Sequence, residues 1–324
     1  MHDLRPLPQM QKTPLYRSGK GVLVIAGPTA TGKSAISIEV AKKIRGEIIS
    51  ADSMQVYRGM NIGTAKLSKA EMEGVPHHLM DLIDVSSSFT VMDYYQRTVE
   101  TIREIHQRGN VPIVVGGTGF YIHTLIYGPP GGPPASPQIR ERLEDELRNL
   151  GPQVMYDRLK NLDLEYAMTI GFGDRQKIVR ALEIITLTNK KVSDFPKFRA
   201  DTKPKEFDFR CHFIYYPKEI LYGRIDRRCD EMIVQGFPEE VERLEKNGLR
   251  ENLSASQAIG YRQYLDFLDS EQRQEDWDQF VWSFKLATRR FAKRQFTWFR
   301  KEPLFQWTDC DLVSREEVLK IILS

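Results

Sequence analysis

One stretch of eight residues combines the residue types and spacing of a phosphate-binding loop. It follows the pattern G-x-x-x-x-G-K-S and consists of Gly27, Pro28, Thr29, Ala30, Thr31, Gly32, Lys33 and Ser34. The glycines let the backbone curl so that successive N–H groups point at phosphate oxygens, and the N-terminus of a following helix favours the same anion. Lys33 adds a positive charge, and the Ser34 hydroxyl can ligate Mg²⁺. The pattern predicts a site for a diphosphate group, with Mg²⁺ as cofactor.

A carboxylate is expected close to this loop. Asp52 ends an apolar run at residues 47–51, which places it at the end of a predicted strand. An Asp in this place can hold a metal ion or act as a general base. Phosphoryl-transfer enzymes usually carry a metal-binding acid at the end of a later strand, but the strand predicted at 111–115 is followed by Gly-Gly-Thr-Gly at 116–119. Spacing alone leaves both roles of Asp52 open.

A parallel sheet would bring these residues together, and the chain has the pattern of one. Apolar runs at residues 21–26, 47–52 and 111–115 alternate with helical patterns at 34–43 and 90–109. Alternation of this kind is typical of parallel strands with helices on both faces. The sequence therefore predicts an α/β fold with a sheet like that of the P-loop NTPases.

A stretch rich in proline and glycine at residues 129–134 interrupts this pattern. Such residues cannot continue a helix or a central strand, so a domain boundary is expected there. A strand pattern returns at 210–216. We therefore expect a discontinuous core of residues 1–128 and 211–324, with an all-helical insertion at 129–210. The helical patterns of the insertion lie at residues 139–150, 154–161 and 174–187.

Composition limits the compartment and the class of protein. The chain has 324 residues, a net charge of +3 and three widely spaced cysteines, Cys211, Cys229 and Cys310. Cysteines without a C-x-x-C pair argue against a disulfide framework and a zinc site. No apolar run approaches the roughly 18 residues that a membrane helix needs, and the N-terminus has no apolar core of signal-peptide length. We expect a cytoplasmic protein without a membrane partner.

Positive charge is concentrated near the C-terminus. Residues 285–301 contain seven Lys or Arg and no Asp or Glu. Lys285, Arg289 and Lys293 follow one another at helical spacing and form a basic face, which would contact phosphates or remain solvated. The aromatic residues that recur every seven positions here, a spacing that favours a stripe of core residues, are Phe284, Phe291 and Trp298.

Several longer blocks add to these motifs. The longest, DSMQVYRGMNIGTAK, occupies residues 52–66, and PHHL and GGTGFY follow at 76–79 and 116–121. Further blocks are RQKIVRALE at 175–183, GF at 236–237, QAIGYR at 257–262, RRFAKRQ at 289–295 and WFR at 298–300. Together with the phosphate-binding loop, and in the same order, they resemble the tRNA dimethylallyltransferase family over about residues 22–300.

The resemblance implies a reaction and its partners. Enzymes of this family transfer the dimethylallyl group of dimethylallyl diphosphate to N6 of the adenosine immediately 3′ of a tRNA anticodon, and they release diphosphate. The implied partners are dimethylallyl diphosphate and the anticodon stem-loop of tRNA. The insertion at 129–210 would correspond to the helical swivel domain of the family, and we expect the chain to act as a monomer.

The resemblance also implies roles for individual residues. Asp52 matches the general base that removes a proton from the adenine amine as the C–N bond forms. Thr118 and Arg224 match groups that stabilise the leaving diphosphate together with the phosphate-binding loop and Mg²⁺. Arg227 and Arg228 follow closely, so the sequence does not decide which arginine meets the diphosphate. A missing acid after residue 115 fits such a reaction, because the diphosphate leaves whole.

Other residues match the tRNA contacts of the family. The target base must leave its stack to enter a channel, so recognition is expected at splayed loop bases and phosphates. The positions that the resemblance implies for contact with tRNA are Asp52, Ser53, Met54, Gln55, Thr118, Arg140, Gln176, Lys177, Ile178, Val179 and Arg180.

Three other functions remain open at this point. A P-loop kinase would explain the loop and the sheet, but it would not explain the missing strand-end acid. A relative that prenylates free AMP or ADP would need neither the helical insertion nor the basic helix. A non-catalytic RNA-binding protein would have no use for the intact loop and Asp52.

Overall fold

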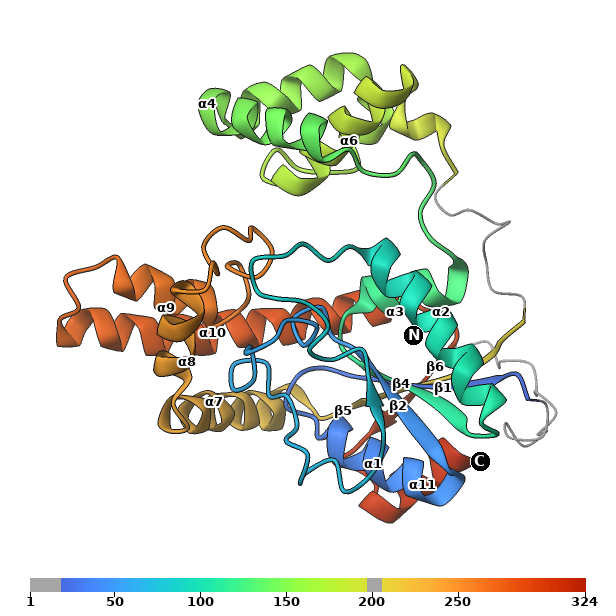
Figure 1. Cartoon of the computed structure of the whole chain (residues 1–324). Coiled ribbons are helices and arrows are strands. Elements are labelled where there is room, and N and C mark those ends of the chain that lie inside the picture. Colours follow the sequence, from blue (N-terminus) through green and yellow to red (C-terminus); the bar gives the residue numbers. More distant parts are fainter. Residues whose placement is uncertain (1–18, 197–205) are drawn as a thin grey trace, which may run out of the picture. The chain divides into compact units, whose positions relative to one another are not determined.

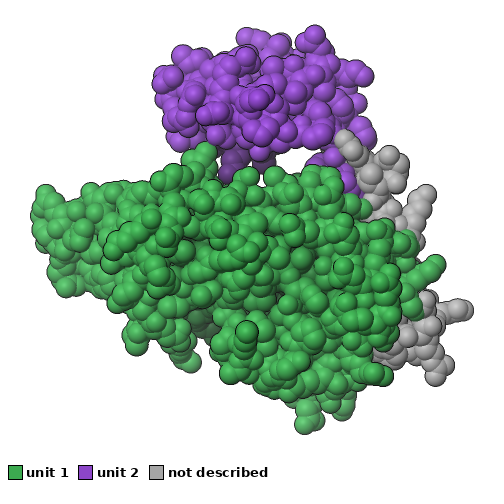
Figure 2. Space-filling view, in the orientation of Figure 1, with its two compact units in different colours: residues 1–126, 204–324 green, residues 127–203 purple. Residues whose placement is uncertain are grey.

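The computed structural model describes residues 19–196 and 206–324, and the chain forms two compact units (Figure 2). Unit 1 comprises residues 1–126 and 204–324, and unit 2 comprises residues 127–203. The sequence placed the second junction at 210/211, whereas the contacts place it at 203/204. The difference arises because strand β5 begins at Asp208, so that residues 208–210 pair with the sheet of unit 1.

Unit 1 contains a six-stranded sheet in which every pair of neighbouring strands is parallel. The strand order is β3-β2-β4-β1-β5-β6. Strands β1 and β4 are buried along their whole length, as expected for strands covered on both faces. The predicted α/β fold with a parallel sheet and flanking helices is confirmed. The strands are β1 (Gly21–Ala26), β2 (Gly46–Ala51), β3 (His77–His78), β4 (Val111–Gly116), β5 (Asp208–Tyr215) and β6 (Phe305–Asp309).

Helices cover both faces of this sheet (Figure 1). Helices α1 and α11 lie below the sheet in Figure 1 and share a core cluster with strands β1, β2 and β4, while α2 and α3 lie above it. Helix α10 also packs on the sheet, since Phe299 contacts the ring of Phe213 on β5. The helices of unit 1 are α1 (Lys33–Ile44), α2 (Val91–Gln107), α3 (Gly119–Tyr127), α7 (Lys218–Val234), α8 (Phe237–Glu245), α9 (Tyr261–Leu268), α10 (Gln274–Phe299) and α11 (Arg315–Leu323).

The register of the central strands decides where the site forms. Ala26 at the end of β1 and Ala51 at the end of β2 are both paired with Gly116 at the end of β4. The loops that follow these three strands therefore emerge side by side at one edge of the sheet, which is where open α/β sheets bind ligands.

Local signals in the sequence explain several helix boundaries. The Thr90 hydroxyl accepts a hydrogen bond from the Asp93 N–H, and the Asp93 carboxylate accepts one from the Thr90 N–H, which is a capping box at the start of α2. In unit 2, α4 (Pro137–Leu162) has non-helical backbone angles at Gly151, directly before Pro152. This break separates the two helical patterns predicted at 139–150 and 154–161.

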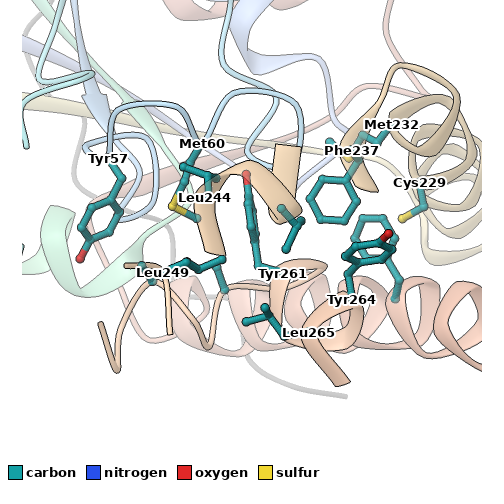
Figure 3. Packing of buried hydrophobic residues seen from close by; sticks show 14 of the residues in the cluster. Tyr57, Met60, Cys229, Met232, Phe237, Leu244, Leu249, Tyr261, Tyr264 and Leu265 are labelled. Carbon is teal, nitrogen blue, oxygen red and sulfur yellow. The ribbon is translucent and has the colours of Figure 1, made fainter. Parts of the chain in front are cut away.

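A second core cluster of unit 1 lies between the C-terminal helices and the chain that follows β2 (Figure 3). Tyr57 and Met60, which come after Asp52, are buried together with Leu244, Phe237 and Tyr261. The rings of Phe237 and Tyr261 meet edge to face with their centroids 5.1 Å apart. The block at residues 52–66 is thus a packed part of unit 1, which gives Asp52 a fixed support.

Unit 2 is helical and has its own core. Helices α4 and α6 (Arg175–Thr188) form it together with α5 (Leu164–Ala167) and the short 3-10 helix η1 (Val192–Asp194). Leu143, Met155, Leu159 and Ile178 are completely buried in it. Among the described residues, no helix is both long enough and apolar enough to cross a membrane.

Candidate active site

A cavity of about 360 Å³ opens at the carboxyl ends of β1, β4 and β2. Its lining includes Lys33 and Ser34 of the phosphate-binding loop, Asp52 after β2 and Thr118 after β4. The structure therefore brings together in one cavity residues that lie far apart in the sequence. The strand order β2-β4-β1 explains this arrangement, because the loop after β4 stands between the other two loops.

The phosphate-binding loop has the shape that its sequence predicts. It connects β1 to α1. Directly before the first helical residue, Gly32 adopts a φ of 84°. Residues other than glycine rarely adopt this backbone conformation. The Thr31 hydroxyl donates a hydrogen bond to Pro28 O at 2.8 Å, which closes the loop on itself. Lys33 and Ser34 at the start of α1 line the cavity, so an anion bound there would be stabilised by the helix N-terminus.

Lys33 is held inside this loop. Its Nζ donates a hydrogen bond to Pro28 O at 2.6 Å. Burial, reinforced by the nearby positive charge of Arg228 and opposed by Asp52, lowers the pKa of Lys33 to about 7. In the absence of an anion the ammonium group is therefore close to losing its proton, and a bound diphosphate would favour the charged form.

Two arginines of α7 flank the loop from one side. Arg224 donates through Nε to Ala30 O at 2.8 Å, and its guanidinium lies 4.6 Å from the centre of the Tyr216 ring. Arg228, one turn further along the helix, donates through Nη1 to the Thr29 hydroxyl at 3.2 Å and lines the cavity. Burial lowers the pKa of Arg228. Arg227 is exposed. Arg228 is thus the arginine of the three that reaches into the cavity, while Arg224 borders the loop.

The loops that carry Asp52 and Thr118 are joined by hydrogen bonds. The Ser53 N–H donates to Thr118 Oγ1 at 3.1 Å, and the Thr118 N–H donates to Ala51 O at 3.1 Å. The Asp52 carboxylate accepts a hydrogen bond from the Met54 N–H at 2.9 Å, which fixes its direction at the end of β2. Asp52 and Thr118 therefore sit in one rigid corner of the cavity.

The residues after Asp52 form one wall of the cavity. Ser53, Met54 and Gln55 all line it, as the sequence placed them next to the carboxylate. The Gln55 side chain accepts a hydrogen bond from the Ser50 hydroxyl at 2.9 Å and donates to Thr64 O at 3.2 Å. Both ends of the Gln55 amide thus have partners within the protein, which holds this side chain in the wall.

Two residues that sequence reasoning did not single out hold the cavity walls. The buried Glu240 accepts hydrogen bonds from the N–H groups of residues 61–63 and from the Tyr261 hydroxyl. Gln295 on α10 bonds both to Thr29 and to Gly117. The signal for Gln295 was its membership of the block at 289–295, but nothing in the sequence indicates what it contacts.

The residues of the cavity suit Mg²⁺ only when a diphosphate supplies some of the metal-binding oxygens. Among the described residues, no group of three or more His, Cys, Asp or Glu could hold a metal ion. Ser34 lines the cavity and is exposed at the start of α1. Mg²⁺ commonly binds through few protein groups and completes its shell with phosphate oxygens and waters. The Ser34 hydroxyl beside a diphosphate fits that mode of binding.

Comparisons with known proteins agree with these features. The family model described as IPP transferase matches residues 55–302. A tRNA dimethylallyltransferase of Protochlamydia amoebophila is 55% identical over 307 residues, which are 95% of this chain and 89% of that protein. The chain belongs to the tRNA dimethylallyltransferase family. The expected class of enzyme, a prenyltransferase, is thereby confirmed.

Solved structures of family members have the same fold. The full-length tRNA isopentenylpyrophosphate transferase of Bacillus halodurans has a TM-score of 0.68 at 38% identity, with 94% of each chain covered. A eukaryotic dimethylallyltransferase, whose structures show it acting on tRNA, has a TM-score of 0.71 at 31% identity, over 90% of this chain and 74% of that one. This chain thus shares its fold with one bacterial and one eukaryotic member of the family.

In this family member, two of the implied tRNA contacts have structural partners inside unit 2. The Glu183 carboxylate is completely buried; it accepts hydrogen bonds from Arg140 at 2.8 Å and from Arg180 at 2.7 Å. Arg180 also donates to Pro133 O. About one third of each arginine side chain stays accessible, 36% for Arg140 and 31% for Arg180. Both arginines tie the start of α4 to α6 and still present part of their surface.

The other implied tRNA contacts of unit 2 divide into two kinds. Gln176 and Lys177 are exposed at the start of α6. Ile178 and Val179 are buried in the core of unit 2, with accessible fractions of 0% and 4%. The buried side chains of Ile178 and Val179 can therefore support α6 from within. They do not reach the surface on which Gln176, Lys177 and Arg180 lie.

The basic face expected on α10 is largely neutralised, which corrects the sequence-based expectation. Lys285 forms an ion pair with Asp230 at 2.6 Å, and Arg289 pairs with Asp226 through both ends of its guanidinium. Both acids belong to α7, so these two partly exposed cations join α10 to α7 and already have carboxylate partners. Lys293 is exposed.

The expected aromatic stripe of α10 is also only partly a core stripe. Phe284 is buried, Phe291 is half-buried and lines the cavity, and Trp298 is 39% exposed. A spacing of seven residues drifts around an α-helix by about 20° per repeat, so the stripe leaves the core along a helix this long.

Proposed function

We propose that this protein transfers the dimethylallyl group of dimethylallyl diphosphate to N6 of the adenosine that follows a tRNA anticodon. The proposal is carried by one observation: the phosphate-binding loop, with Lys33, and the Asp52 carboxylate line the same cavity, and Thr118 lines it too. A diphosphate site beside a carboxylate suits the transfer of an alkyl group to a weakly acidic amine. The relatives named above are tRNA dimethylallyltransferases, which supports the same acceptor.

In the proposed reaction the bond between the prenyl carbon and the diphosphate oxygen breaks, and the bond from N6 to that carbon forms. Asp52 accepts the proton that N6 loses, because the amine becomes acidic as the new bond develops. The bond from Met54 N–H keeps one carboxylate oxygen in place and leaves the other available for the proton.

The leaving diphosphate gains negative charge as its bond to carbon breaks. The N–H groups at the start of α1, the ammonium of Lys33 and the guanidinium of Arg228 would stabilise this charge, and the Thr118 hydroxyl would donate a hydrogen bond to it. Arg224 would meet the outer phosphate from the edge of the loop. Mg²⁺ held by Ser34 and the diphosphate would supply further positive charge.

Recognition of tRNA is proposed to involve both units. Ser53, Met54 and Gln55 would hold the flipped adenine beside Asp52. Arg140, Gln176, Lys177 and Arg180 of unit 2 would contact the anticodon stem-loop, with Ile178 and Val179 supporting α6 from within. We propose that the enzyme works as a monomer in the cytoplasm.

Mass spectrometry of tRNA tests the proposal. The purified protein is incubated with Mg²⁺, dimethylallyl diphosphate and bulk tRNA, and nucleosides are analysed for a dimethylallyl group on adenosine 3′ of the anticodon. Parallel reactions contain AMP in place of tRNA, or labelled ATP without dimethylallyl diphosphate. Prenylated AMP without prenylated tRNA would establish a free-nucleotide acceptor. Turnover of ATP alone would indicate a kinase and would rule out the proposed reaction.

A further inference from the structure

The side chain of Gln295 bridges two walls of the cavity. Its Oε1 accepts a hydrogen bond from the Thr29 N–H at 3.0 Å, and its Nε2 donates one to Gly117 O at 3.0 Å. Thr29 belongs to the phosphate-binding loop after β1, and Gly117 to the loop after β4. One amide on α10, only 5% exposed, thus joins the ends of two neighbouring strands.

The bridge continues on both sides into residues of the site. On one side, the Thr29 hydroxyl accepts the hydrogen bond from Arg228. On the other side, Gly117 precedes Thr118, whose hydroxyl accepts the hydrogen bond from the Ser53 N–H next to Asp52. Gln295 therefore lies in the middle of a series of contacts that runs from Arg228 to the turn carrying Asp52.

The surroundings of Gln295 fit an amide closely. A methyl group at residue 117 would come within 2.1 Å of the Gln295 Nε2, so the glycine makes room for the bridge. The bridge needs an acceptor and a donor at the end of one side chain, which an amide provides. A carboxylate has no donor, an ammonium has no acceptor, and a thioether has no effective donor.

We propose that Gln295 is a positioning residue that sets the spacing between the phosphate-binding loop and the loop of residues 116–119. With that spacing fixed, Lys33, Arg228 and Thr118 meet one diphosphate while Asp52 stays within reach of the acceptor amine. This inference rests on the proposed function, because it assigns Gln295 a part in holding the same diphosphate. Without the bridge each loop keeps its residues, but their separation is no longer fixed.

Binding of inorganic diphosphate provides the first test. Gln295→Met has a similar volume and removes both hydrogen bonds; Gln279→Met, an exposed position on the same helix, is the matched control. Calorimetry with Mg²⁺ and inorganic diphosphate should show roughly 10- to 100-fold weaker binding for Gln295→Met and no change for the control. Folded Gln295→Met that binds within threefold of the wild type would overturn the inference.

A double-mutant cycle separates positioning from mere stabilisation of the fold. If Gln295 acts through Thr118, then Gln295→Met should lower the kcat for prenyl transfer much less in a Thr118→Val background than in the wild type. Equal effects in the two backgrounds would contradict the inference. Should Gln295→Met not fold, Gln295→Asn replaces it in both tests, because its amide is one methylene too short to reach both loops.

The two tests also distinguish this inference from the proposed function. Inorganic diphosphate binding needs no prenyl group and no acceptor. If the wild type binds diphosphate but yields no prenylated tRNA, the proposed reaction is contradicted. The comparison of diphosphate binding between the wild type and Gln295→Met still tests the role of Gln295. Wild-type protein that prenylates tRNA with Gln295→Met unaffected contradicts the positioning role alone.

Discussion

The backbone N–H of Ser53 donates a hydrogen bond to the side chain of Thr118 across the ends of β2 and β4. Thr118 is thereby tied to the turn that carries Asp52, although 65 residues separate it from Ser53. The same hydroxyl also donates a long hydrogen bond to the Ser53 hydroxyl at 3.5 Å, so Thr118 is joined to this turn in both directions. The group that would meet the leaving diphosphate and the group that would accept the proton are therefore parts of one corner.

Replacing Asp52 with asparagine should abolish proton removal while keeping the structure of this corner of the cavity. Asparagine keeps an oxygen for the Met54 N–H but cannot accept the proton, so kcat should fall by about 10²- to 10⁴-fold. Inorganic diphosphate binding, measured by calorimetry, should stay within a few-fold of the wild type because the phosphate-binding loop is unchanged. Near-normal turnover in Asp52→Asn would remove this carboxylate from the mechanism.

The affinity for diphosphate should depend on pH through Lys33. The pKa of Lys33 in the free protein is lowered to about 7, and a bound anion favours the charged ammonium. Above pH 7 the free protein must therefore take up a proton to bind, so affinity should fall by up to about tenfold for each pH unit. Calorimetry from pH 6 to 9 measures this slope.

Lys33→Met is the control for this slope, since inorganic diphosphate also titrates in this range. The variant should bind more weakly at pH 6, and the part of the pH dependence that belongs to the lysine should vanish. Parallel curves for the wild type and Lys33→Met would show that Lys33 keeps its proton throughout.

Arg228 should contribute more to diphosphate binding than its neighbour Arg227. Arg228 lines the cavity, whereas Arg227 is exposed on the same helix. Loss of a charge-assisted hydrogen bond predicts roughly 10- to 100-fold weaker diphosphate binding for Arg228→Gln and little change for Arg227→Gln. Because the charge of Arg228 helps to lower the pKa of Lys33, Arg228→Gln should also shift the midpoint of the pH dependence upward. Equal affinities of the two variants would contradict this assignment.

The sequence was most informative where one motif contains all the partners. The phosphate-binding loop is a local pattern and has the predicted geometry, and the helix predicted from residue 90 begins at an equally local capping box. Asp52 could be placed at a strand end for the same reason. The position of Thr118 beside Asp52 depends on the order of the strands in the sheet. The periodicity of a single sequence does not determine this order.

The remaining parts of the site depend on contacts between distant segments. Helical spacing places Arg224 and Arg228 one turn apart, but it does not indicate which of them enters a cavity. The bridge made by Gln295 joins loops that come near α10 only in the folded chain. Likewise, the acids that pair with Lys285 and Arg289 lie on another helix. The sequence around the basic residues therefore gives no sign of these ion pairs.

These ion pairs change the expectation for tRNA binding. Arg290 and Lys293 are exposed, whereas Lys285 and Arg289 are paired with α7. If the exposed pair contacts phosphates, Arg290→Gln with Lys293→Gln should reduce the slope of log affinity against log salt by roughly one to two. Filter binding of tRNA at several salt concentrations measures this slope.

The matched control for this prediction is Lys285→Gln with Arg289→Gln, which removes the same charge. It should leave the salt slope nearly unchanged and lower the melting temperature slightly, because partly exposed ion pairs contribute about 0–1 kcal/mol each. A larger loss of slope in the control than in Arg290→Gln with Lys293→Gln would show that the paired residues release their acids to bind tRNA.

The stability of unit 1 should decline in mild acid because of His212. This residue of β5 is 1% exposed, and neither ring nitrogen has a hydrogen-bond partner among the described residues. Burial, assisted by Arg210, lowers the pKa of His212 from 6.5 to about 4. Between pH 6.5 and 4, His212 therefore binds a proton in the unfolded chain but stays neutral in the folded chain. The free energy of unfolding consequently falls as the pH falls through this window.

The difference between the two pKa values corresponds to a loss on the order of 3 kcal/mol over the window. Urea unfolding at pH 7, 5.5 and 4 should show this loss in the wild type, and His212→Leu should remove it while other titrating groups are retained. Stability at pH 7 should change little in the variant or increase, because leucine leaves no polar atom unpaired in the core. A loss of the same size in both proteins would mean that another group, and not His212, takes up the proton on unfolding.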